Sequence, residues 1–152
     1  MKAEEVIRLR ALVNSFRTAI LRTDKNKLTI SFRDFPAGSC GDACLLLAKF
    51  LDDAGYGLAT YVAGSRGPYS HAWLELGGLQ IDITADQFVC DPEKLLWTGQ
   101  PLELQDGVIV STDRTWHAGF DDESRHSADI RSYGARTQAI LNHSYREILA
   151  NI

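Results

Sequence analysis

Three short apolar runs in the middle of the chain, each bounded by turn residues, place the strongest limit on the fold. They read LATYVAG from residue 58, HAWLEL from residue 71 and LQIDIT from residue 79. Short runs of this composition are typical of strands, and Gly77 with Gly78 between the last two predicts a tight hairpin turn. The sequence therefore predicts antiparallel strands in this region.

Apolar residues at steps of three and four on both sides of these runs are typical of amphipathic helices. The spacing predicts helices over residues 3–22 and 135–152. A further helix is expected to begin at Cys40, with Ser39 as its cap, and to end before Gly55; its alanine and leucine content predicts that it is largely buried. A helix followed by antiparallel strands predicts an α+β fold with the Cys40 helix packed on the sheet.

The part of the chain after the hairpin carries weaker signals. Pro92 and Pro101 bracket an expected short helix, and the VIVST run at residues 108–112 could add a strand. Residues 112–133 look polar and irregular, and we assign them no element. A chain of 152 residues fits one domain, and no boundary stands out, so we expect residues 1–152 to form a single domain.

Composition excludes several classes of function. Sixteen basic and twenty acidic residues give a net charge of −4 without a long basic block, so nucleic acid is not an expected partner. No stretch approaches the roughly 20 apolar residues of a membrane span. Three cysteines are too few and odd in number for a disulfide framework, which predicts a reducing, cytoplasmic location.

Three residues in these elements together suggest nucleophilic chemistry. A helix N-terminus favours the thiolate form of a cysteine, and Cys40 occupies such a position. His71 opens the second strand run, where it can act as a general base. Counting outward from the two glycines pairs Trp73 with Asp82, which places His71 and Asp82 on one face of the sheet, so that the carboxylate can orient the imidazole.

The motifs GSCGDA, SHAWLEL and IDIT, in this order, resemble those of papain-like and transglutaminase-like thiol enzymes, and the order Cys, His, Asp is most similar to the transglutaminase core. The resemblance covers about residues 35–90. It implies a nucleophile helix packed on an antiparallel sheet, with Cys40, His71 and Asp82 as the catalytic triad. The implied function is a cysteine hydrolase, either peptidase or deamidase, or an acyltransferase acting on amide or acyl bonds of a protein or peptide.

The oxyanion-stabilising donors are less well defined. Papain proper has a glutamine ahead of its cysteine, whereas RDFPAGS precedes Cys40 here. The backbone N–H of Cys40 could act with a second donor, for which Gln87 and Trp73 are both candidates.

Other interpretations of the same residues stay open. A domain of this fold could bind a peptide or a partner protein without catalysis. Cys40 and Cys44, one helical turn apart, could sense redox state, although their spacing differs from CxxC. Cys44 by itself is more typical of a small buried apolar residue. Asp82 on an apolar strand would be costly to bury without a partner, which favours a pairing with His71.

No metal or other cofactor is expected. Zinc sites commonly show CxxC or HxxxH spacing, which is absent from the set Cys44, Cys90, His117, His126 and His143. The segment GSRGPYS, residues 64–70, does not match a phosphate-binding loop and is interpreted as a mobile loop beside His71.

Overall fold

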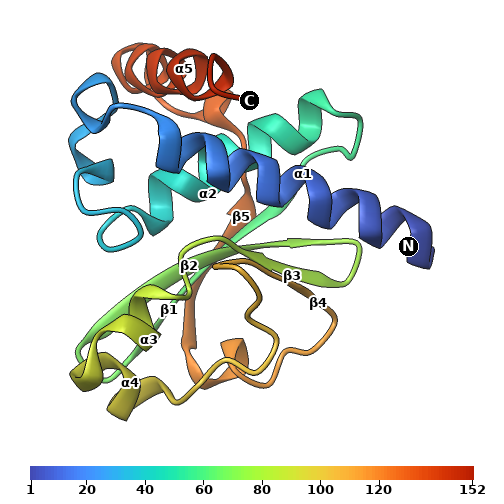
Figure 1. The fold of residues 1–152 in the computed structure, drawn as a ribbon, viewed down its shortest axis with the longest axis vertical. Coiled ribbons are helices and arrows are strands. Elements are labelled where there is room, and N and C mark those ends of the chain that lie inside the picture. Colours follow the sequence, from blue (N-terminus) through green and yellow to red (C-terminus); the bar gives the residue numbers. More distant parts are fainter.

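The computed structural model describes the backbone of residues 1–152 and every side chain except those of residues 122 and 123. It is a mixed α+β fold, with a five-stranded antiparallel sheet that carries long helices on one face (Figure 1). These helices are α1 Ala3–Arg22, α2 Cys40–Asp53 and α5 Ala135–Leu149. The three helices expected from the sequence are therefore confirmed, with nearly the predicted ends.

The sheet has the strand order β4-β3-β2-β1-β5. Its strands are β1 Thr60–Arg66, β2 Tyr69–Leu76, β3 Leu79–Asp82, β4 Ile109–Ser111 and β5 Asp121–Ser127. The strands expected around the glycine turn and at VIVST are thus present. Because β2 and β3 lie inside the sheet, with neighbours on both sides, their apolar residues can be buried on both faces.

The β2–β3 hairpin has the register that its two glycines predict. Both glycines of the turn adopt positive φ, which residues with a side chain rarely do. Leu74 pairs with Ile81, and the pairing continues down to the turn. Since side chains alternate between faces along a strand, His71 and Asp82 project from the same face of the sheet.

Two expectations for the chain around these strands are wrong. The segment predicted as a mobile loop before His71 continues β1 and β2, with a tight turn at Gly67 and Pro68 between them. The segment 112–133, which received no element, contains β5 at the sheet edge beside β1. The run DDESRHS of β5 has none of the apolar alternation that signals a half-buried strand, and charged side chains are common on edge strands.

Helix α2 forms the centre of the core because it lies between the sheet and the two other long helices. It contributes buried side chains around most of its circumference, namely Ala43, Cys44, Leu45, Leu46, Leu47, Ala48 and Leu51. Helices α1 and α5 contribute one face each, with residues such as Phe16 and Tyr145 against it. A helix that is apolar all round is typical of a fully buried position, which fits the predicted burial.

A smaller apolar cluster covers the opposite face of the sheet. Its buried members are Val62, Trp73, Phe88 and Phe120, with Tyr69 and Trp116 packed against them. The short helices α3 Gln87–Cys90 and α4 Pro92–Thr98 lie on this side, and α4 is the helix expected after Pro92 (Figure 1). The sheet is therefore covered on both faces, and His71 and Asp82 project into the aromatic side.

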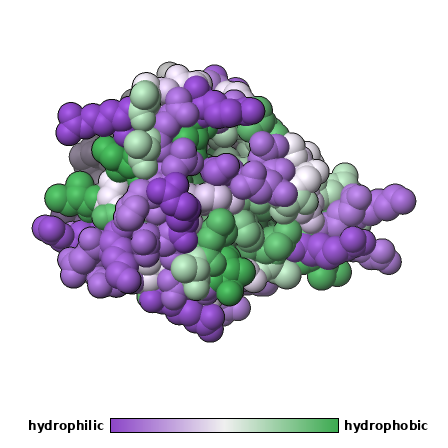
Figure 2. Space-filling view, turned by 90° about the horizontal axis from the view of Figure 1, so that it is seen from above, coloured by the Kyte–Doolittle hydropathy of each residue, from purple (hydrophilic) through white to green (hydrophobic). Residues whose placement is uncertain are grey.

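The surface seen from above in Figure 2 is mainly hydrophilic, with apolar side chains in small separate groups. None of the described helices is both long and apolar enough to cross a membrane.

Candidate functional site

Cys40 is the first residue of α2, as predicted, and is partly exposed. Ser39 occupies the N-cap position, but its hydroxyl donates to the Pro36 carbonyl oxygen at 3.0 Å and does not cap the helix. Helix N–H groups of the first turn lack intrahelical acceptors, and together with the helix dipole they favour a negative charge. The local structure therefore supports a thiolate at Cys40.

Gly41 and Tyr61 shape the space next to the cysteine. A side-chain carbon at Gly41 would lie 3.2 Å from the Tyr61 hydroxyl oxygen, so the missing side chain lets the phenol approach the start of α2. The Tyr61 ring stacks on His126 with 4.8 Å between centroids. Burial, with smaller effects of Cys44 and Cys40, raises the pKa of Tyr61, so its hydroxyl stays a hydrogen-bond donor.

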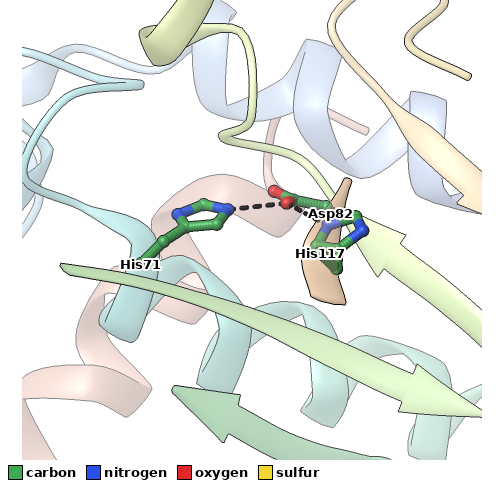
Figure 3. A group of neighbouring side chains, drawn as sticks. All are labelled: His71, Asp82 and His117. Atoms are coloured by element: carbon green, nitrogen blue, oxygen red, sulfur yellow. Dashed lines mark hydrogen bonds and ion pairs between the residues drawn. The ribbon is translucent and has the colours of Figure 1, made fainter. Parts of the chain in front are cut away.

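His71 in β2 is buried, and its Nε2 lies 2.6 Å from Oδ2 of Asp82 (Figure 3). The β2–β3 ladder ends at the pair Leu74 and Ile81, and the two polar side chains meet just beyond that point. The other ring nitrogen of His71, Nδ1, is buried and has no hydrogen-bond partner among the described residues. That nitrogen is left available to the thiol of Cys40.

Asp82 is buried and accepts hydrogen bonds on both oxygens. Oδ1 accepts from the Thr84 backbone N–H at 3.0 Å and from the Thr84 hydroxyl at 3.4 Å. Oδ2 accepts from Nε2 of His71 and from Nε2 of His117. Burial alone would raise the pKa of the Asp82 carboxyl, but the charge and hydrogen bond of His71 and the hydrogen bond of His117 hold it well below its usual range. Asp82 is therefore a carboxylate, and both histidines donate to it.

His117 is the residue of this group that sequence reasoning did not find. It begins a short helical turn, His117–Gly119, and its Nε2 lies 2.8 Å from Oδ2 of Asp82 (Figure 3). Its side chain is 3% exposed. The signal in the sequence is TWHAGF, in which two aromatic residues flank a histidine inside an otherwise polar segment. Trp116 and Phe120 both pack into the aromatic cluster and carry the histidine inward.

Opposing effects set the protonation of the cysteine and the histidine. Burial raises the pKa of the Cys40 thiol, but the neighbouring His71 imidazole and the Ala72 backbone N–H lower it, and the net pKa is below the ordinary value. Burial lowers the pKa of His71, whereas the charge and hydrogen bond of Asp82, helped by Cys40, raise it to about 9. The environment thus favours a thiolate next to an imidazolium.

Aromatic rings enclose the imidazole of His71. The nearest are Phe88, edge-on at 4.9 Å between centroids, and Phe120 at 5.5 Å; Trp116 lies at 5.8 Å and Trp73 stacks at 5.9 Å. This enclosure keeps solvent from the pair formed by His71 and Asp82, and an interaction between charges is stronger in such a low-dielectric setting.

Gln87 and Trp73, the predicted oxyanion donors, both form internal hydrogen bonds. The Trp73 indole Nε1–H donates to Oε1 of Gln80 at 2.9 Å. The Gln87 amide donates to the Thr84 carbonyl oxygen at 3.1 Å and accepts from Lys94 at 3.4 Å. Their role therefore stays a prediction, and these internal bonds compete with it.

His71, Asp82 and His117 are also the one group among the described side chains that could hold a metal ion. One ligand atom each from His71, Asp82 and His117 lie within 4.8 Å of one another. A metal would have to replace the protons that both histidines donate to the carboxylate. The cysteines and the other histidines considered from the sequence do not join this group.

Two cavities border His117, with volumes of about 310 Å³ and 250 Å³. The larger also touches Arg66 and Trp116, and the smaller touches Trp73 and Gln80. Cys40, His71 and Asp82 line neither of them.

Comparison with models of protein families, with curated proteins and with solved structures gave no match. The structure itself establishes a mixed α+β fold in which a cysteine lies near a buried group of two histidines and an aspartate.

Proposed function

We propose that this protein is a thiol enzyme with a papain-like or transglutaminase-like core, in which Cys40 attacks the carbonyl of an amide or ester in a protein or peptide. The observation that carries the proposal is the buried imidazole of His71, held by Asp82 at Nε2 while it lowers the pKa of the Cys40 thiol. The order of the three residues along the chain and their placement on a helix start and two adjacent strands support it.

The proton transfers follow from which nitrogen is occupied. Nδ1 of His71 takes the proton of the Cys40 thiol, and the sulfur attacks the carbonyl carbon to form a tetrahedral oxyanion. When the carbon–nitrogen bond breaks, Nδ1 donates that proton to the leaving amine. Water or an amine then gives a proton to Nδ1 as it attacks the thioester, and that proton returns to the Cys40 sulfur when it leaves. Asp82 stays ionised throughout and stabilises the imidazolium.

The oxyanion would face the N-terminus of α2, where the backbone N–H of Cys40 can donate to it. If water resolves the thioester, the product is a carboxylic acid; if an amine does, the acyl group is transferred to that amine. We favour hydrolysis, as in a peptidase or a deamidase. The alternative, a module that binds a peptide without turnover, predicts a Cys40 thiol of ordinary reactivity.

The first test is the pH dependence of Cys40 alkylation by iodoacetamide, with the label located by mass spectrometry. We expect Cys40 to react well below the ordinary thiol pKa of about 8.5 and to lose this behaviour in His71→Gln, because the imidazole stabilises the thiolate. The exposed Cys90 in the same chain serves as an internal reference.

A matched control is His143→Gln, which removes an exposed histidine of α5 and should leave the Cys40 profile unchanged. Circular dichroism would establish that each variant is folded. If Cys40 of the wild-type protein titrates like Cys90, the thiol enzyme is refuted and the binding module takes its place.

A further inference from the structure

His117 is a second histidine on the carboxylate that orients the first one, and the proposed mechanism does not use it. Its Nε2 lies 2.8 Å from Oδ2 of Asp82, and Nε2 of His71 lies 2.6 Å from the same oxygen. All three side chains are at most 3% exposed. A second buried donor on one oxygen atom is not needed to satisfy Asp82, because its other oxygen is already bonded to Thr84.

We infer that His117 is a positioning residue that limits how strongly Asp82 holds the proton of His71, an inference that rests on the proposed function. The charge of Oδ2 is shared between two donors, so each receives a weaker interaction than a sole donor would. A general acid works best when its pKa lies near the pH at which it operates. His71 must release its proton to the leaving amine, and a carboxylate bonded to His71 alone would oppose that release.

The burial of this group makes the effect depend on His117 itself. The side chain of His117 packs between Trp73 and Trp116, each 4.9 Å away between ring centroids. Solvent has little access to Oδ2 at this position, so removing the imidazole leaves His71 as the one donor to that oxygen. The bonds to Thr84 keep the carboxylate oriented in either case.

Other charged groups surround His117 but are less closely coupled to Oδ2. Besides His71, the ionisable groups that face His117 or Asp82 are Cys40 and Cys44 of α2, Asp86 before α3, Asp113 and Arg114 in the loop before His117, Arg66 of β1, Glu103 and Asp121. Asp113 is exposed, so water and salt screen its effect. The buried contact with Asp82 therefore dominates.

The test follows the titration of His71 by NMR of its ring protons, assigned by their loss in His71→Gln. His117→Phe keeps an aromatic ring in the cluster but donates no hydrogen bond, and we expect it to move the His71 midpoint upward by roughly one pH unit. His117→Gln restores an N–H donor and should bring the midpoint back toward the wild-type value.

A structural role alone would lower the melting temperature of His117→Phe and leave the His71 midpoint unchanged, and that result, or a downward shift, would overturn the inference. If His117→Phe does not fold, the tautomer of His117 in the wild-type protein tests the inference instead. A proton on Nε2 supports donation to Asp82, and an unprotonated Nε2 refutes it. If Cys40 of the wild-type protein reacts at low pH but the His71 midpoint does not move in His117→Phe, the proposed function stands and this role of His117 is rejected. If the His71 midpoint moves but Cys40 does not react at low pH, the role of His117 stands and the proposed function is rejected.

Discussion

Asp82 is the residue on which the rest of the group depends, because its two oxygens accept from four donors in a buried place. A carboxylate can only accept, so both histidines must present an N–H at Nε2. That requirement fixes the tautomer of neutral His71 and leaves Nδ1 as the base. The identity of one side chain thus sets which nitrogen can exchange a proton with Cys40.

Replacing Asp82 by asparagine should abolish the enhanced reactivity of Cys40. In Asp82→Asn the amide NH₂ must face either the histidines or the Thr84 N–H. In either orientation an N–H of the amide points at another N–H, and at least one hydrogen bond of the wild-type protein is lost. We expect the alkylation rate at pH 6 to fall on the order of 10²-fold, because His71 is no longer held as a base. The matched control is Asp91→Asn, which caps α4 and keeps a capping side chain. An unchanged rate in Asp82→Asn would contradict the role of the carboxylate.

At the scale of elements, a close approach between β1 and β5 brings the His117 segment to His71. Gly64 of β1 pairs with His71 on one side, and the β1–β5 register shifts between Ala63 and Gly64 on the other. A side-chain carbon on Gly64 would lie 2.4 Å from the Asp121 backbone oxygen, a distance that such atoms do not adopt. Glycine at this position lets the chain after His117 return against the sheet.

Gly64→Ala should therefore weaken the sheet and displace the segment that carries His117. We expect the free energy of unfolding, measured in urea, to fall by about 1–3 kcal/mol, since the neighbour on β5 is backbone and cannot rotate away. Ser65→Ala, at the next position of β1, is the control and should change stability by less than about 0.5 kcal/mol. Equal stabilities of the two variants would show that β5 does not pack as closely as described.

For the whole molecule, α1 is tied to the end of β3 through Arg17. Its Nε donates to the Ile83 carbonyl oxygen at 3.1 Å and its Nη2 forms an ion pair with Asp86 at 2.5 Å. These contacts join the N-terminal helix to the strand that carries Asp82, over a separation of 66 residues. The position of the site is thus coupled to the packing of the helix layer.

The buried charges also predict how stability depends on pH. Between the ordinary histidine pKa of about 6.5 and the raised pKa of about 9, folded His71 keeps a proton that the unfolded chain has lost, so stability falls as pH rises. Folded Cys40 has a lowered pKa and loses a proton that the unfolded chain keeps, which acts in the opposite direction. Where the two pH ranges overlap, these contributions offset each other in the wild-type protein.

Cys40→Ser removes the thiol and leaves the contribution of His71. We expect its free energy of unfolding to fall above pH 6.5 by on the order of 1 kcal/mol per pH unit, while the wild-type curve stays flatter. Asp82 has a lowered pKa, so its contribution is present throughout this range and is lost in acid. Urea titrations at several pH values make the comparison, and parallel curves for the two proteins would contradict a thiolate and imidazolium pair.

The sequence alone determined the features that depend on neighbours along the chain. Periodicity predicted α1 and α5, and the end signals Ser39 and Gly55 predicted α2. The two glycines predicted the β2–β3 register, and that register placed His71 and Asp82 on one face. These features can be predicted from the sequence because each depends on residues only a few positions apart.

Tertiary structure alone decided what depends on distant contacts. His117 lies 35 residues from Asp82, and β5 has too little apolar alternation to be recognised before β1 is placed beside it. The Ser39 hydroxyl, the Trp73 indole and the Gln87 amide were assigned roles from their positions, but packing gave each an internal partner. A buried polar atom bonds to whichever group the fold brings near it, and the local sequence does not specify that group.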